Sequence, residues 1–96
     1  MKKLNTQQAE LARAKLTPSW ELVKGVILQK TYKFDDYDAV IKFFADTKDV
    51  QVELDHFADF AFFYNELLVR ITTKDVEGLT VLDYQLAKAF DIIKEQ

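Results

Sequence analysis

The chain has 96 residues, of which 49% are apolar and 30% are charged, a composition typical of one soluble globular domain with a single modest core. Its 13 basic and 16 acidic side chains leave a net charge of -3. Because most nucleic-acid-binding proteins attract phosphate with a positive surface, we expect no direct binding of nucleic acid. The absence of cysteine excludes disulfides, thiolate metal sites and cysteine nucleophiles.

Residues 5–10 are mainly polar where a secretory signal peptide would have its apolar segment, and no apolar run is long enough to span a membrane. We therefore expect a cytoplasmic protein without a membrane segment. One Pro and two Gly leave no linker or low-complexity tract. Residues 1–96 are predicted to form a single domain.

The first third of the chain predicts a short helix followed by a β-hairpin. Asn5 or Thr6 is suited to cap the helix, which Pro18 ends. Residues 20–23 and 26–34 predict two strands around a Lys-Gly turn. The apolar face of the second strand consists of Leu28, Tyr32 and Phe34, with Lys30 interrupting it.

A second helix is predicted to begin after Asp35 and Asp36, and we extend it to about Leu54 because no turn residue comes earlier. The two aspartates and Asp38 fit helix capping better than a cation site. Apolar side chains recur at helical spacing and predict one face packed on a sheet. This predicted stripe consists of Tyr37, Val40, Ile41 and Phe44.

Residues 60–64 and 67–73 predict a second hairpin, joined through Asn65 and Glu66. Thr80 and Asp83 then resemble a capping box at the start of the last helix. That helix carries the clearest apolar stripe of the chain. Its members are Leu82, Leu86, Ala89, Phe90 and Ile93.

The order helix, hairpin, helix, hairpin, helix predicts an α+β fold. Hairpins imply antiparallel pairing, so the expected architecture is a two-layer sandwich in which helices cover one face of a four-stranded antiparallel sheet. The register of the second hairpin stays open. A three-residue turn places Phe60, Phe62 and Tyr64 on the open face with Leu68, as an apolar patch typical of an interface or pocket. A two-residue turn places the three aromatic side chains in the core.

His56 is the only histidine, and imidazole is the side chain that best gives and takes a proton near neutral pH. It follows the second predicted helix directly. Interaction with the carbonyl end of that helix is an equally simple interpretation of its position. No phosphate-binding glycine loop, metal-ligand spacing or nucleophile triad accompanies it, so we predict neither a metal site nor a cofactor.

Several segments together resemble one family. These are residues 54–60, 64–65, 72–73 and 78–80, followed by Asp83. In this spacing they are similar to the pterin-4a-carbinolamine dehydratases, and the likeness extends from about Trp20 to about Ile93. The resemblance implies the same α+β fold and homodimers or homotetramers. It also implies dehydration of 4a-hydroxytetrahydropterin without a metal, as part of recycling the pterin cofactor of aromatic amino-acid hydroxylases.

The family's site resembles a cluster of three histidines, and this sequence matches it only in part. His56 falls on the first histidine of an adjacent pair, whereas Phe57 takes the second and Leu68 the third. Lys74 stands where the pattern usually has histidine or tryptophan. The other departures are Ala58 in place of a proline and Val52 in place of an acidic residue, while Tyr64 and Asp83 match.

Two hypotheses on function follow. The resemblance implies a dehydratase in which His56 is catalytic and a pterin contacts Phe57, Phe60, Tyr64 and Leu68. Because the reaction needs both an acid and a base, and because catalytic groups of one cluster are strongly non-additive, we expect the loss of two histidines to leave weak activity or none. The alternative is a non-catalytic module for assembly or for binding a protein partner. One family member acts as a dimerisation cofactor of a homeodomain transcription factor.

Overall fold

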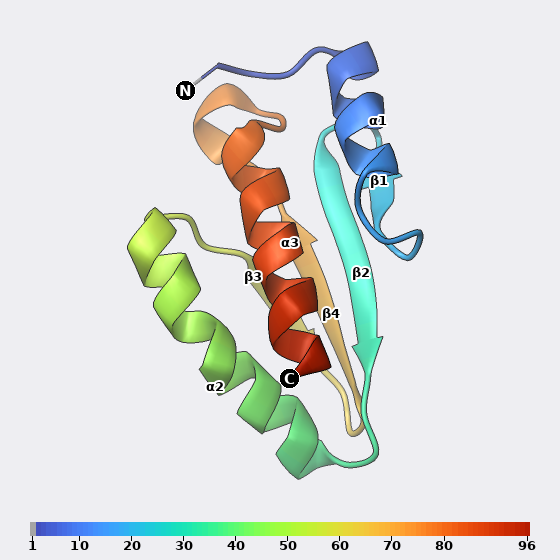
Figure 1. The fold of residues 1–96 in the computed structure, drawn as a ribbon, viewed down its shortest axis with the longest axis vertical. Helices are drawn as coiled ribbons and strands as arrows, with labels where there is room; N and C mark the ends of the chain where they lie inside the picture. Colours follow the sequence, from blue (N-terminus) through green and yellow to red (C-terminus); the bar gives the residue numbers. More distant parts are fainter. Residues whose placement is uncertain (1) are drawn as a thin grey trace.

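A computed structural model describes residues 2–96, so Met1, which the predicted domain includes, lies outside the described residues. The helices and strands follow the predicted order, with a short 3-10 helix added before the last helix (Figure 1). Their bounds are α1 Thr6–Ala14, β1 Glu21–Val23, β2 Ile27–Lys33, α2 Tyr37–Leu54, β3 Asp59–Phe62, β4 Glu66–Ile71, η1 Lys74–Val76 and α3 Val81–Glu95.

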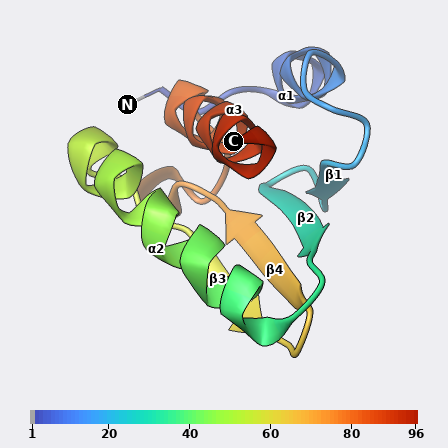
Figure 2. The ribbon, with the colours of Figure 1, turned by 60° about the horizontal axis from the view of Figure 1, so that its bottom comes forward.

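The four strands form one antiparallel sheet in the order β1-β2-β4-β3. Figures 1 and 2 show α2 and α3 on the same side of this sheet, with α1 beside the β1–β2 hairpin. The core between the two layers contains Leu28, Val69, Leu86 and Phe90, each with no exposed surface. The predicted α+β two-layer sandwich is confirmed. No element among the described residues covers the opposite face of the sheet.

Local signals read from the sequence account for the ends of the elements. Asn5 caps α1 in a capping box with Gln8, and the Asp36 carboxylate accepts a hydrogen bond from the backbone N–H of Ala39 at the start of α2. The β1–β2 turn spans residues 24–26 between the paired Val23 and Ile27, and it places Lys24 and Gly25 at φ 54° and 73°, in the left-handed region. The predicted caps and turn are therefore confirmed.

The register of the second hairpin, which the sequence left open, is the one expected for a two-residue turn. Phe60 pairs with Val69 and Phe62 with Leu67, so both aromatic rings lie on the helix-covered side. The backbone N–H of Phe63 donates to Glu66 at 2.9 Å, which closes a two-residue turn. Because side chains alternate along a strand, this turn length decides which face every β3 side chain occupies.

The stripe predicted for α2 is largely wrong. Only Val40 of its four members is buried, whereas Tyr37, Ile41 and Phe44 are 45%, 40% and 36% exposed. The buried side of the helix includes Phe43 and two polar side chains, Thr47 and Gln51. These polar groups are tolerated because they bond each other and the backbone. Gln51 Nε2 lies 3.1 Å from Thr47 Oγ1, whose proton goes to the carbonyl of Phe44.

Lys30 interrupts the apolar face of β2, and its position there is explained by its ion pair with a carboxylate on α3. Its Nζ lies 2.6 Å from Asp91 Oδ1, and both side chains are nearly buried, at 12% and 13% exposed. Asp91 also accepts hydrogen bonds from Tyr32 Oη, Trp20 Nε1 and the Thr17 hydroxyl. One acceptor on α3 thus ties together β2 and the segment leading into β1.

Burial opposes the charge of Asp91, but the hydrogen bonds from Lys30, Tyr32 and Trp20 outweigh it and lower the pKa of this carboxyl below its ordinary value. Burial, and then the bond to Asp91, raise the pKa of Tyr32 far above its ordinary value. At neutral pH the cluster therefore holds an ionised Asp91 carboxylate and a protonated Tyr32 phenol.

Candidate functional site

His56 is positioned by the end of α2. Asp55 adopts the left-handed conformation at φ 50° and ψ 44°, which stops the helix and reverses the chain. The backbone N–H of His56 then donates to the carbonyl of Gln51 at 3.0 Å, and the Gln51 side-chain oxygen accepts from the N–H of Ala58 at 3.0 Å. These two bonds to α2 hold the loop that carries the imidazole, which is 9% exposed.

The imidazole forms a buried pair with a carboxylate. His56 Nε2 lies 2.6 Å from Oδ1 of Asp83, a side chain with no exposed surface. The other oxygen, Oδ2, accepts from the Thr73 hydroxyl at 2.7 Å and from the backbone N–H of Thr80 at 2.8 Å. Asp83 thus caps α3, as predicted, and also orients His56, a role that its capping pattern alone did not reveal.

This pairing determines which imidazole nitrogen is available for chemistry. Because an ionised carboxylate only accepts hydrogen bonds, Nε2 of His56 carries a proton in the pair with Asp83. The neutral imidazole therefore keeps its lone pair on Nδ1. Among residues 2–96 Nδ1 of His56 has no hydrogen-bond partner. Since every fully buried side-chain nitrogen or oxygen among these residues has a partner, Nδ1 is at least partly exposed. His56 thus presents a proton acceptor toward solvent.

A depression of about 250 Å³ lies beside this pair. The end of α2 forms one side of it, and the segment from the end of β4 into η1 forms the other. The Thr72 hydroxyl donates to the backbone carbonyl of Val26, and the Thr73 hydroxyl donates to Asp83. The lining side chains are Asp55, His56, Phe57, Thr72, Thr73, Lys74 and Asp75.

The five residues predicted for the site do not come together. Phe57, 58% exposed, shares the depression with His56, but Phe60 lies on the helix side of β3. Leu68 lies on the open face, in a separate hollow with Ala61 and Arg70, and Tyr64 is 69% exposed in the β3–β4 turn. Of the four predicted binding residues, the structure places only Phe57 at the depression beside His56, while Phe60 lines the hollow that contains Leu68.

Position 74 borders the depression although position 68 does not. The cause is again strand alternation: Leu68 points away from the helices, while the chain beyond β4 turns back toward His56 through η1. Sequence reasoning assigned the third histidine of the cluster to Leu68 and noted Lys74 only as a departure. In the structure Lys74, and not Leu68, lines the depression beside His56.

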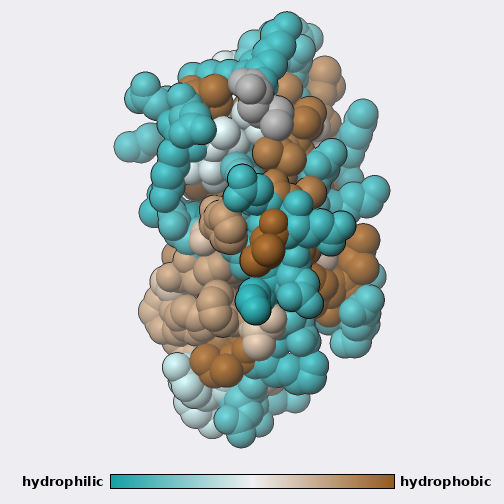
Figure 3. Space-filling model, turned by 90° about the vertical axis from the view of Figure 1, so that its left-hand side faces the viewer, coloured by the Kyte–Doolittle hydropathy of each residue, from teal (hydrophilic) through white to brown (hydrophobic). Residues whose placement is uncertain are grey.

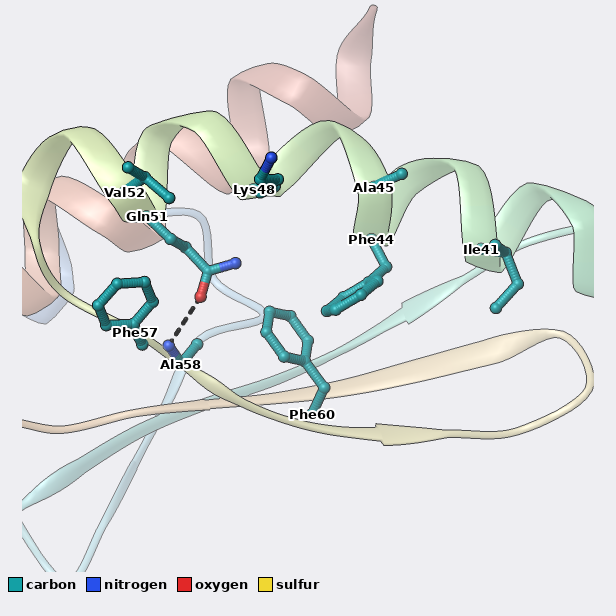
Figure 4. Close-up of a pocket in the computed structure, with 9 residues that line it drawn as sticks. All are labelled: Ile41, Phe44, Ala45, Lys48, Gln51, Val52, Phe57, Ala58 and Phe60. Atoms are coloured by element: carbon teal, nitrogen blue, oxygen red, sulfur yellow. Dashed lines mark hydrogen bonds between the residues drawn. The ribbon is translucent and has the colours of Figure 1, made fainter.

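A larger apolar groove of about 630 Å³ runs between α2 and β3 (Figure 4). The Phe44 ring contacts Phe60 and Phe62 edge-on, with centroids 4.9 and 5.0 Å apart. Figure 3 shows this side of the molecule, where tan and brown apolar side chains gather in one area. The groove is lined by Ile41, Phe44, Ala45, Lys48, Gln51, Val52, Phe57, Ala58 and Phe60. Phe57 therefore separates the groove from the His56 depression.

Within residues 2–96, no group of three or more His, Asp or Glu side chains is placed to hold a metal ion. Among the same residues, no helix has the length and apolar character needed to cross a membrane.

Comparisons with known proteins identify the family of the chain. The family model described as pterin 4 alpha carbinolamine dehydratase matches residues 2–93. A relative from Prochlorococcus marinus, provisionally named pterin-4-alpha-carbinolamine dehydratase, is 34% identical over 93 residues, covering 97% of this chain and 95% of the relative. A similarly named protein of Sulfurisphaera tokodaii is 33% identical over 91 residues, 95% and 96% of the two chains.

Solved structures show the same fold. The crystal structure of a transcriptional coactivator/pterin dehydratase from Brucella melitensis has a TM-score of 0.89 and 26% identity, covering 96% of this chain and 98% of that one. A pterin dehydratase-like protein identified as a RuBisCO assembly factor in the alpha-carboxysome has a TM-score of 0.66, with coverage of 80% and 90%. At 15% identity the second likeness concerns the fold alone.

The three helices and the open four-stranded antiparallel sheet define a pterin dehydratase-like α+β domain. The chain belongs to the pterin-4a-carbinolamine dehydratase family.

Proposed function

We propose that the protein is a weak pterin-4a-carbinolamine dehydratase that acts through His56. The observation that carries the proposal is the His56 and Asp83 pair, which engages one imidazole nitrogen in a side chain that lines a depression together with an aromatic ring, Phe57. Family membership supports the substrate class, a 4a-hydroxytetrahydropterin. The single histidine supports low activity, since the reaction divides its proton transfers between two groups.

In this proposal Nδ1 of His56 takes the proton from N5 of the pterin ring while the 4a-hydroxyl departs. Asp83 stabilises the imidazolium that forms, because its carboxylate already accepts from Nε2. Phe57 supplies a flat apolar surface against which the pterin ring can stack. No metal is needed for these steps.

The direct test is the rate of carbinolamine dehydration by the wild type and by His56→Ala. We expect the substitution to reduce the rate at least about 10²-fold, the lower range for a positioned acid or base. Stopped-flow absorbance with freshly generated carbinolamine measures it, and circular dichroism checks that both proteins are folded. Equal rates for the two folded proteins, or a wild type no faster than buffer, would refute the proposal.

Phe57→His offers a test by gain of activity, because it restores the second member of the adjacent pair. The side chain is 58% exposed at the edge of the depression, so the smaller imidazole fits without disturbing the core. We expect kcat to rise by up to about 10²-fold. Phe57→Asn is the matched control, since it has a polar side chain of similar size that does not exchange a proton. A histidine variant no faster than the asparagine variant contradicts the expectation.

A second candidate function, an assembly module, is favoured by the apolar groove. β3 is an edge strand of the sheet, and unpaired strand edges invite pairing with another chain. Beside that edge α2 exposes Ile41, Phe44 and Val52, at 40%, 36% and 57%. A contiguous apolar surface of this kind marks protein contacts. We propose that this surface forms the homodimer or homotetramer expected from the sequence; the cytoplasmic location expected there stays a prediction.

Val52→Glu tests the assembly proposal. A carboxylate in the groove is costly to bury, so we expect the wild type to sediment as a dimer or larger at tens of micromolar and the variant to sediment as a monomer. Ile92→Glu is the matched control, because Ile92 is also an apolar side chain, 50% exposed, on α3 outside the groove. A wild type that stays monomeric at this concentration, or equal dissociation of both variants, would remove the proposal.

A further inference from the structure

The dehydration needs an acid for the departing hydroxyl, and the His56 and Asp83 pair does not supply one. In that pair Nδ1 is an acceptor, and the proton on Nε2 is held by a buried carboxylate. The candidates for the acid are the remaining side chains around the depression. Their hydrogen bonds distinguish them.

The other polar side chains at the depression have no proton to spare. Thr72 donates to the backbone oxygen of Val26 at 2.6 Å, and Thr73 donates to Asp83 at 2.7 Å. Asp55 and Asp75 are exposed carboxylates, which accept hydrogen bonds when ionised. Lys74 alone among the lining residues carries a cationic group with protons to donate.

From this geometry we infer that Lys74 is the second catalytic residue, whose ammonium group protonates the 4a-hydroxyl as it leaves. The inference rests on the proposed dehydratase function. Its ammonium lies 3.7 Å from Asp59 Oδ1, and the two side chains are 74% and 64% exposed. An ion pair this loose and solvated holds a lysine weakly, so the side chain is free to turn toward a bound ligand.

The backbone beneath Lys74 is fixed relative to the imidazole. The preceding residue, Thr73, donates its hydroxyl proton to the same Asp83 that holds His56. Its backbone also forms a bridge with Gly78, with N–H to O distances of 2.8 and 3.3 Å. A rigid support thus places the base and the flexible cation on two sides of one depression.

The step balances without another reactant. The C4a–O bond breaks as the oxygen takes a proton from Lys74 and leaves as water, while N5 gives its proton to Nδ1 of His56 and its electron pair forms the C4a=N5 double bond. His56 ends as imidazolium and Lys74 as a neutral amine. Transfer of one proton between them through solvent restores the starting state.

Lys74→Met and Lys74→Arg separate proton donation from charge, because arginine keeps the charge but does not release its proton. We expect Lys74→Met to lower kcat about 10²-fold, and Lys74→Arg to lower it clearly but less. Lys88→Met is the matched control, since it removes the same charge from an exposed position on α3.

The outcomes distinguish this inference from the proposed function. One outcome refutes the role of Lys74 but leaves the dehydratase function supported. In this outcome the wild type turns over faster than His56→Ala, while the kcat of Lys74→Met lies within twofold of that of Lys88→Met. A Lys74→Arg variant as fast as the wild type refutes proton donation by Lys74. A folded wild type without turnover refutes the dehydratase and, with it, the role of Lys74.

Discussion

Replacing Asp91 by alanine is expected to lower the free energy of unfolding by about 3–5 kcal/mol, the range observed when one partner of a buried ion pair is removed. The variant leaves Lys30 as a charge without its partner on the core face of β2, and it removes the acceptor of Tyr32 and Trp20. Urea unfolding followed by Trp20 fluorescence measures the change. For a chain of this size the melting temperature should fall by roughly 12 °C or more.

Two controls keep this prediction specific. Asp46→Ala removes the exposed pair with Lys42, which at 48% and 79% exposure should contribute less than about 1 kcal/mol. The double variant Lys30→Met with Asp91→Leu removes both buried charges, so it should recover part of the stability lost in Asp91→Ala. A loss below about 1 kcal/mol in Asp91→Ala would show that the cluster does not stabilise the fold.

The same cluster predicts how stability depends on pH. Because the folded pKa of Asp91 lies below its unfolded value, the pair contributes its full stability above the unfolded value of about 4. That contribution is lost as the pH falls through the lowered pKa in the folded state. The stability difference between the wild type and Asp91→Leu should therefore shrink below pH of about 4, and a constant difference over this range would contradict the assignment.

Replacing Asp83 by asparagine is expected to reduce dehydration on the order of 10²- to 10⁴-fold, and to the uncatalysed rate if wild-type activity is low. The amide keeps the shape of the side chain but makes one of its two acceptors a donor. Because Thr73 and Thr80 both donate to Oδ2, the amide nitrogen is forced toward His56 Nε2. The imidazole must then carry its proton on Nδ1 and loses the lone pair that the reaction uses.

Nitrogen NMR of the single imidazole provides a measurement independent of activity. The wild type should show the neutral form protonated on Nε2, and Asp83→Asn should show the form protonated on Nδ1. Thr73→Val is the matched control, because it removes one bond to Asp83 without placing a donor beside His56. An unchanged tautomer together with an unchanged kcat in Asp83→Asn would contradict the positioning role.

Local patterns predicted most of the fold because each depends on residues close in sequence. The caps at Asn5, Asp36 and Thr80, and the turn at Gly25, follow from side chains that bond their own helix start or from a backbone that needs a left-handed residue. Leu67, Val69 and Ile71 alternate along β4 and all three have no exposed surface, as side-chain alternation in a strand requires. Such signals need no knowledge of distant partners.

The errors arose where a partner far along the chain decides. Lys30 is tolerated on the core face because it pairs with Asp91, which lies 61 residues further along the chain. The exposed Tyr37, Ile41 and Phe44 looked like a core stripe because helical spacing shows that one face is apolar without showing what covers it.

The sequence by itself determined the order of the elements and the family, and it singled out His56 as the candidate catalytic residue, since these depend on local periodicity and on residue identity. Only the tertiary structure decided that Asp83 orients the imidazole from 27 residues away, and that Lys74 rather than Leu68 shares the depression with it. The physical reason is that proton chemistry depends on distances of a few ångströms between side chains. Those distances follow from strand register and from the path of the chain after β4.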